Sequence, residues 1–162
     1  MSARILSVLP LGAALGCALV AGVMFAFSSF VMPGLARMAP PQGIAAMQSI
    51  NRSAVSSSFL AVFVGTAAIC AVVAGAALLD AKGAGDALRI GGAVAYLAGA
   101  VAITRVIHVP RNDALDALDP RSVEAAALWP GYIATWTAWN HVRMVAATLA
   151  AGALVLSTKV SS

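Results

Sequence analysis

Four long runs of apolar residues, separated by short polar segments, dominate the sequence. A helix needs about 20 apolar residues to cross the hydrocarbon layer of a bilayer, and each run reaches that length or is flanked by arginines that can extend to the headgroups. The runs predict membrane spans over residues 8–32, 53–79, 88–108 and 132–158. We therefore expect an all-α fold, an integral membrane four-helix bundle that forms one domain over residues 1–162.

The first and third loops each contain a helical pattern. Pro40 and Pro41 predict the first turn of a helix, which we expect to continue into the second span. Pro110 predicts the end of the third span, because the residue before a proline avoids the helical region. A short amphipathic helix with Leu115 and Leu118 on its apolar side should follow. Both loops are thus expected to carry short interfacial helices.

Turn and capping signals separate the remaining elements. Ser122 is placed to cap a further helix that ends at Leu128. The fourth span is then expected to begin near Pro130. A polar, glycine-containing turn is predicted over residues 80–85, between the second and third spans.

Small residues recur at helical spacing within two of the spans. Gly12 and Gly16 form a GxxxG pair in the first span, and Gly91, Ala95 and Gly99 follow one another at four-residue steps in the third. Such residues let helix backbones approach closely in membranes. The sequence therefore predicts that the faces of the first and third spans that carry these small residues pack tightly against neighbouring helices.

Composition narrows the class of protein further. Hydrophobic residues make up 61% of the chain and charged residues 10%, against about 45–50% and 25% in soluble domains, which excludes a water-soluble globule. The net charge is +4 without a basic cluster, so no nucleic-acid partner is expected. Cys17 and Cys70 lie inside apolar runs without metal-ligand spacing, and we expect them to behave as inert small hydrophobes.

The fourth span carries a polar and aromatic stripe. At 100° per residue its members fall within an arc of about 100°; they are Tyr132, Trp136, Trp139, Asn140 and Arg143. One interpretation is an interfacial aromatic belt with an arginine that reaches the headgroups. The other is that these costly polar groups face a cavity inside the bundle.

Polar residues of the other spans are expected at the same end of an antiparallel bundle. They are Ser28 and Ser29 in the first span, Gln48, Asn51 and Arg52 before the second, and Thr104, Arg105 and His108 at the end of the third. Asn112 follows close by. Together they could ring a pocket just below the membrane surface.

Metal chemistry is a weaker alternative. His108 and His141 are expected at the same membrane end, so a haem or copper ion held by both is geometrically conceivable. Against it, the sequence offers no third imidazole, no thiolate pair and no transmembrane carboxylate. Nucleotide-binding, hydrolase and zinc-protease motifs are also missing from the chain.

Three regions of the chain resemble the anthrone-oxygenase-like family of small four-helix integral membrane proteins, much of which is known only as a domain of unknown function. The regions are GVMFAFSSFVMPGLAR (22–37) with QSINR (48–52), HVPRNDAL (108–115) and WTAWNHVR (136–143). In the second region, His108 and Arg111 depart from the pattern Asn-Val-Pro-Leu-Asn that we expect of the family. The family's named members are similar to enzymes that oxidise anthrones to anthraquinones with O2, without a metal or flavin.

The chemistry of this reaction points to candidate roles for individual residues. His108 would be the base, and Asn140 and Arg143 would stabilise the anions formed. Substrate-binding residues would be Ser28, Asn51, Arg52, Asn112, Tyr132, Trp136 and Trp139. No metal ligand and no cofactor are expected in this mechanism.

The leading hypothesis is therefore a membrane oxygenase that acts on an anthrone-like or quinol-like aromatic compound. One alternative is a non-enzymatic membrane protein that binds or carries a small apolar ligand or serves as a subunit of a complex. The weaker one is the haem or copper redox protein. We expect the protein to lie in a lipid bilayer, that of the bacterial inner (cytoplasmic) membrane. A homo-oligomer is compatible with this fold.

Overall fold

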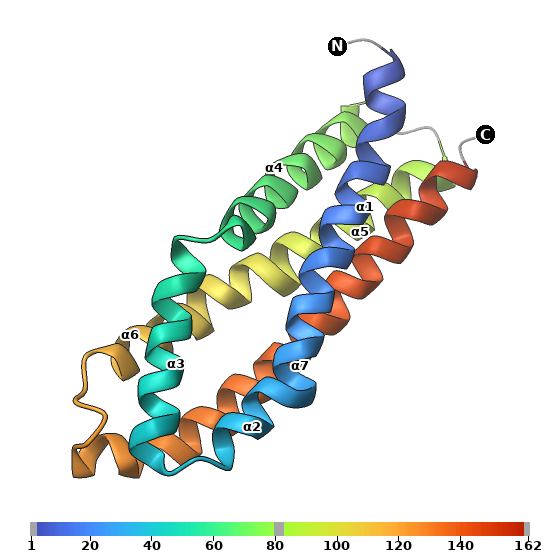
Figure 1. Ribbon diagram of the computed structural model, residues 1–162. Helices are drawn as coiled ribbons and strands as arrows, with labels where there is room; N and C mark the ends of the chain where they lie inside the picture. Colours follow the sequence, from blue (N-terminus) through green and yellow to red (C-terminus); the bar gives the residue numbers. More distant parts are fainter. Residues whose placement is uncertain (1–2, 80–82, 161–162) are drawn as a thin grey trace.

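The computed structural model describes residues 3–79 and 83–160, and every element in these two ranges is helical (Figure 1). The prediction of an all-α four-helix bundle is confirmed. In chain order the α-helices are α1 (Ala3–Ala26), α2 (Met32–Ala36), α3 (Pro40–Val55), α4 (Ser58–Leu79), α5 (Ala84–Tyr96), α6 (Val109–Asp116) and α7 (Val123–Val160). Three π-helical segments interrupt them: η1 (Phe27–Val31), η2 (Leu97–Ala102) and η3 (Thr104–His108).

The helices form an up-and-down bundle. Four continuous helical stretches are long and apolar enough to cross a membrane: Val8–Ala36, Ser58–Leu79, Ala84–Asp116 and Val123–Val160. The start of α1, the end of α4, the start of α5 and the end of α7 lie at one end of the bundle, whereas α2, α3 and α6 lie at the other (Figure 1). The chain is therefore an integral membrane protein whose short helices α2, α3 and α6 gather at a single end.

The first loop differs from its prediction at the second span. Pro40 starts α3 after an extended Ala39, as expected. However, α3 does not continue into the second span, because the helix ends at Val55 and α4 begins at Ser58. The hydroxyl groups of Ser56 and Ser57 bond to the carbonyls of residues 53 and 54, and such local bonds compete with a helical backbone.

The third span does not end at Pro110, and that prediction was wrong. Helix continues from η3 through Val109 and Pro110 to Asp116. Local π-helical adjustment lets membrane helices tolerate a proline by satisfying the freed backbone groups. Here η3 lies directly before the proline, and Arg111 Nη1 donates to the carbonyl of Ile107 at 3.0 Å.

The fourth span begins earlier than predicted. Ser122 caps the helix as expected, with its Oγ accepting the Ala125 N–H at 3.1 Å. Helix α7 then runs without a break through Pro130 rather than ending at residue 128. Trp129 and Tyr132, on either side of the proline, are buried and stack with centroids 5.6 Å apart, which holds the two segments as one helix.

In the predicted turn over residues 80–85, residues 80–82 lie outside the described residues, and α5 already begins at Ala84.

Two clusters of buried apolar residues make up the core. The larger one fills the space between α1, α4, α5 and α7 and is centred on Cys17, Val20, Tyr96 and Leu154. The smaller one lies at the other end, where α2, α3, α6 and the first turns of α7 meet, and consists of Met32, Leu35, Ile44, Met47, Leu115, Ala125, Trp129, Tyr132 and Trp136. The cavity that holds the candidate site residues lies where these clusters meet.

Close helix packing depends on two of the predicted small residues. A methyl group added at Gly16 would collide with the Thr66 hydroxyl on α4, and one added at Gly99 would collide with Ala146 on α7. In contrast, Gly12 and Gly91 have no neighbouring atom in that position. The prediction that these two also mark close contacts was wrong, because helical spacing alone does not show which member of a GxxxG pair faces a neighbour.

We expect Gly99→Ala to destabilise the bundle by about 1–3 kcal/mol, because overpacking forces neighbouring atoms apart. The measurement is unfolding of the purified protein in detergent. Gly12→Ala is the matched control and should leave stability unchanged or slightly higher. Adding Ala146→Gly to Gly99→Ala should restore the lost stability. Equal stability of the Gly99→Ala and Gly12→Ala variants would contradict the packing contact.

Candidate functional site

A cavity of about 540 Å³ lies between the two core clusters. Four parts of the chain form its walls: the end of α1 with η1, the α3–α4 junction, η3 with α6, and the middle of α7. Its polar lining residues include Asn51, Thr104, His108, Asn112, Asn140 and Arg143. Most of the remaining lining is apolar, so the site combines a hydrophobic enclosure with a few polar groups, as ligand sites commonly do.

Asn140 ties α7 to the first membrane helix. Its Nδ2 donates to the Met24 carbonyl and to Ser28 Oγ, both at 2.7 Å. Its Oδ1 accepts from Arg143 Nη2 at 2.6 Å. Asn140 is fully buried and all three bonds are short, so this side chain is fixed in position and in turn orients the guanidinium group.

Arg143 is a buried cation with neutral partners. Besides Asn140, its Nη1 donates to Thr104 Oγ1 at 2.9 Å, and its Cζ lies 5.4 Å from the centre of the Trp136 ring. Only 7% of the residue is exposed, and its Nε has no hydrogen-bond partner within residues 3–79 and 83–160. Neither ion pair found among the described residues involves Arg143. The site therefore holds a positive charge that no carboxylate of the described chain neutralises.

His108 packs against the same tryptophan. Its Nε2 lies 3.2 Å from the Trp136 carbonyl, and the two rings meet edge to face with centroids 5.0 Å apart. A carbonyl can only accept, so this contact assigns the ring proton to Nε2 and leaves Nδ1 with the free lone pair. The residue is 2% exposed and Nδ1 is buried without a hydrogen-bond partner among the described residues.

Asn112 links the cavity to the aromatic face of α7. Its Oδ1 accepts from the Tyr132 hydroxyl at 2.8 Å and from Trp136 Nε1 at 3.2 Å. These bonds fix the position of the Trp136 ring. His108 contacts this ring edge to face, and the Arg143 guanidinium lies over it. Asn51 lines the cavity from α3, and its Nδ2 is buried without a hydrogen-bond partner in the described part of the chain.

The structure brings together most of the predicted site residues. His108, Asn140, Arg143, Asn51, Asn112 and Trp136 line the cavity, and Ser28 and Tyr132 bond directly to lining residues. Gln48 lies apart from them, because its amide donates to the carbonyls of Leu115 and Leu118 and joins α3 to α6.

Two predicted substrate-binding residues lie outside the cavity. Arg52 is 60% exposed in its side chain and forms an ion pair with Asp116. Trp139 is 37% exposed, on the outer surface of α7. Neither belongs to the lining of the cavity, and we assign neither of them a role in binding.

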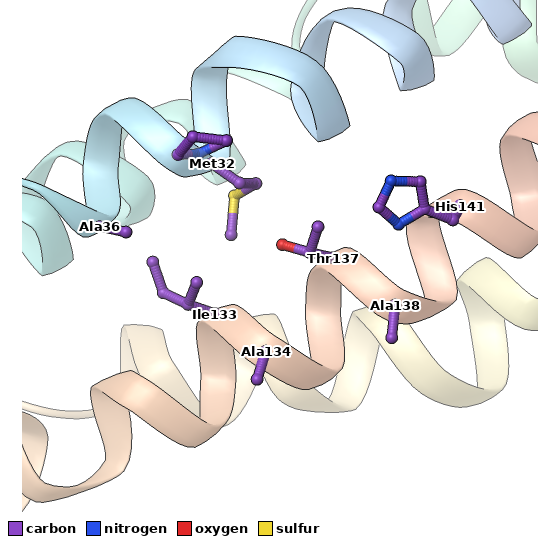
Figure 2. Close-up of a pocket in the computed structure, with 8 residues that line it drawn as sticks. Met32, Ala36, Ile133, Ala134, Thr137, Ala138 and His141 are labelled. Carbon is purple, nitrogen blue, oxygen red and sulfur yellow. The ribbon is translucent and has the colours of Figure 1, made fainter.

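His141 faces a different hollow. Figure 2 shows its ring at one end of a shallow groove of about 410 Å³, where Met32 and Ala36 on α2 face Ile133 and Thr137 on α7. The two histidines thus open onto separate pockets, which argues against one haem or copper ion held by both. Within the described residues, no three His, Cys, Asp or Glu side chains come together as a metal site would require.

Sequence reasoning missed the apolar wall opposite the polar groups. Phe27 from η1 and Phe59 and Phe63 from α4 line the cavity, and Phe27 packs against Trp136 at 5.5 Å. The i,i+4 pair of phenylalanines at the start of α4 was the available signal. The π-helical segments η1 and η3, which lie beside the site as such segments often do, had no signal in the pattern.

Comparison with known proteins identifies a family. The family model of anthrone oxygenase matches residues 56–153, a range that begins just before α4 and contains His108, Asn112, Trp136, Asn140 and Arg143. No curated protein and no solved structure matches the chain. The family match covers more than half of the sequence and includes two of the four walls of the cavity, η3 with α6 and the middle of α7, together with the α4 part of a third. The chain belongs to the anthrone oxygenase family.

Proposed function

We propose that the protein is a membrane-embedded oxygenase that oxidises a hydrophobic anthrone-like or quinol-like compound with O2 in the cavity, without a metal or flavin. The observation that carries the proposal is Arg143, a cation buried beside an apolar cavity without a carboxylate partner in the described chain. Burying an unpaired charge in a membrane is costly. An anion formed from the substrate or from O2 would gain from this charge, and the neutral substrate would not.

The dimensions and walls of the cavity suit a flat aromatic molecule. Its volume of about 540 Å³ lies in the range of small-molecule sites, roughly 300–1,000 Å³. Phe27, Phe63 and Trp136 supply aromatic surface to its lining, and such rings favour contact with other aromatic systems.

The reaction needs only a proton acceptor and a place for negative charge. A base removes one proton from the benzylic CH2 of an anthrone, and the enolate passes one electron to O2. The resulting carbon radical and superoxide combine to form a C–O bond, and the peroxide takes up the proton from the base. Loss of the second C–H proton then breaks the O–O bond, so that one anthrone and one O2 give one anthraquinone and one water.

His108 is the proposed base and Arg143 the stabiliser of the enolate and superoxide. The Nδ1 lone pair of His108 is the free basic atom, but it is covered in this structure. The base role therefore requires the ring to turn toward the cavity when substrate enters. Catalytic contacts of this kind are often incomplete before the substrate binds. Asn140 and Thr104 hold the guanidinium group in place and so preorganise the charge.

Substrate is proposed to enter from the bilayer through the α3–α4 junction. Val55 and Leu60 line the cavity and are also exposed on the outer surface, 70% and 37% respectively. Such a route suits a lipophilic substrate dissolved in a membrane, for which we propose the bacterial cytoplasmic membrane.

We expect Arg143→Met to leave a folded membrane protein whose kcat/KM with anthrone falls by about 10²–10³-fold, the effect of losing one stabiliser of an oxyanion. The assay is O2 uptake together with the absorbance of anthraquinone. Arg105→Met is the matched control, because Arg105 is an exposed arginine close to the same site, and it should retain activity. Unchanged turnover in Arg143→Met would remove this residue from the mechanism. Binding of anthrone by the unmodified protein without turnover would favour a carrier.

His108→Ala should lower kcat by about 10²–10⁴-fold, the usual contribution of a general base. The substitution also opens a space beside Trp136, so added imidazole should restore part of the rate. A loss of activity that imidazole and other small bases fail to restore, in a protein with unchanged stability, would assign His108 a packing role instead.

A further inference from the structure

A second pair of reactive side chains lies deeper in the bundle. Cys17 on α1 and Cys70 on α4 are the two cysteines of the chain, and both are fully buried and free. Their sulfur atoms face each other at 4.0 Å although the residues are 53 positions apart. The expectation that each is only an inert small hydrophobe does not account for this pairing.

The helices that carry the pair lie close together. Gly16, next to Cys17, packs directly against the Thr66 hydroxyl, one turn before Cys70 on α4. Small residues therefore let α1 and α4 approach closely at this level. A disulfide needs the sulfur atoms about 2 Å closer than they are here, so its formation requires rotation of the thiols and a small helix shift. We propose that Cys17 and Cys70 form an oxidation-sensitive dithiol that closes to a disulfide between α1 and α4.

The oxidant we infer is hydrogen peroxide. One thiol is first oxidised to a sulfenic acid and releases one water, and the second thiol then displaces the hydroxyl to form the S–S bond and a second water. Two thiols and one peroxide thus give one disulfide and two waters. A soft monovalent metal ion such as Cu(I) would compete for the two thiolates as ligands, but two thiolates with one monovalent ion would leave a net negative charge in the apolar core. The disulfide keeps the site neutral, as burial in hydrocarbon favours.

Closure of this pair would also act on the cavity, an effect that rests on the proposed function. Cys17 lies about two turns from Met24 on α1, and Cys70 about two turns from Phe63 on α4. Met24 and Phe63 both line the cavity. A covalent link between α1 and α4 would restrict the movement of these walls and slow substrate entry or product release. Superoxide that escapes the proposed reaction and dismutates would supply the peroxide.

The test is made on the full-length protein in lipid nanodiscs treated with hydrogen peroxide. Unreacted thiols are then alkylated after unfolding, and the intact mass and the digested peptides are measured. We expect a loss of about 2 Da for the two hydrogens, no alkylation, and a peptide linked through both cysteines. The controls Cys17→Ala and Cys70→Ala should each keep one alkylatable thiol and show no such loss. Two alkylated thiols, a sulfinic acid, or disulfides between separate chains would overturn the pairing.

The effect on the cavity has its own readout. Peroxide should lower anthrone turnover several-fold in the unmodified protein, and reducing agent should restore it, while Cys70→Ala should stay unaffected. A disulfide that forms without any change in turnover overturns the effect on the cavity. If neither the unmodified protein nor its variants oxidise anthrone, the proposed function is wrong. The mass measurement then still shows whether the disulfide forms.

Discussion

A buried arginine whose partners are all neutral is the constraint on which the site depends. An arginine at the centre of a membrane helix costs about 2.5–3.5 kcal/mol, and this one is compensated by an amide, a hydroxyl and the face of an indole ring. Each of those partners is itself held by another element: Asn140 by the Met24 carbonyl, Thr104 by the Ala100 carbonyl and Trp136 by Asn112. The charge of Arg143 therefore fastens α1, the third span and α7 to one another. Because its partners are neutral, the charge is still free to stabilise an anion.

The helical backbone beside the cavity is irregular. Segments η1 and η3 lie on two sides of the cavity, and Pro110 follows η3 directly. A π-helical turn shifts the register of backbone bonding, so that carbonyl groups become accessible to side chains. The Met24 carbonyl, just before η1, accepts from Asn140. Membrane helices tolerate such irregularity only where it is buried in protein or lines a cavity, and here the irregular backbone lies beside the one cavity that contains the buried charge.

The sequence predicted the class of fold and the position of the site better than their details. Long apolar runs define membrane helices almost independently of context, so the four spans and their antiparallel order could be predicted. The stripe on α7 gave Trp136, Asn140 and Arg143 for the same reason. Trp139 lies at the edge of that stripe, where the neighbouring helices decide which side chain is covered. Arg52 was misplaced because its partner Asp116 is distant in sequence. Helix continuity through Pro110 and Pro130 depends on π-helical turns and on aromatic stacking, which a propensity rule for proline does not contain.

His108 has a structural role and a proposed chemical role, and only the chemical role requires an imidazole. The contact of His108 Nε2 with the Trp136 carbonyl fixes the side chain, and the amide of an asparagine, the residue expected in the family pattern, also offers an N–H donor to a carbonyl. The packing role of this position therefore does not require an imidazole. What asparagine lacks is the basic lone pair of Nδ1. A histidine here adds a proton acceptor beside a buried cation, and it keeps the contact with the Trp136 carbonyl until its ring turns toward the substrate. The base is consequently the part of the proposed mechanism most specific to this chain, whereas Arg143 and its neutral partners belong to the framework on which the base acts.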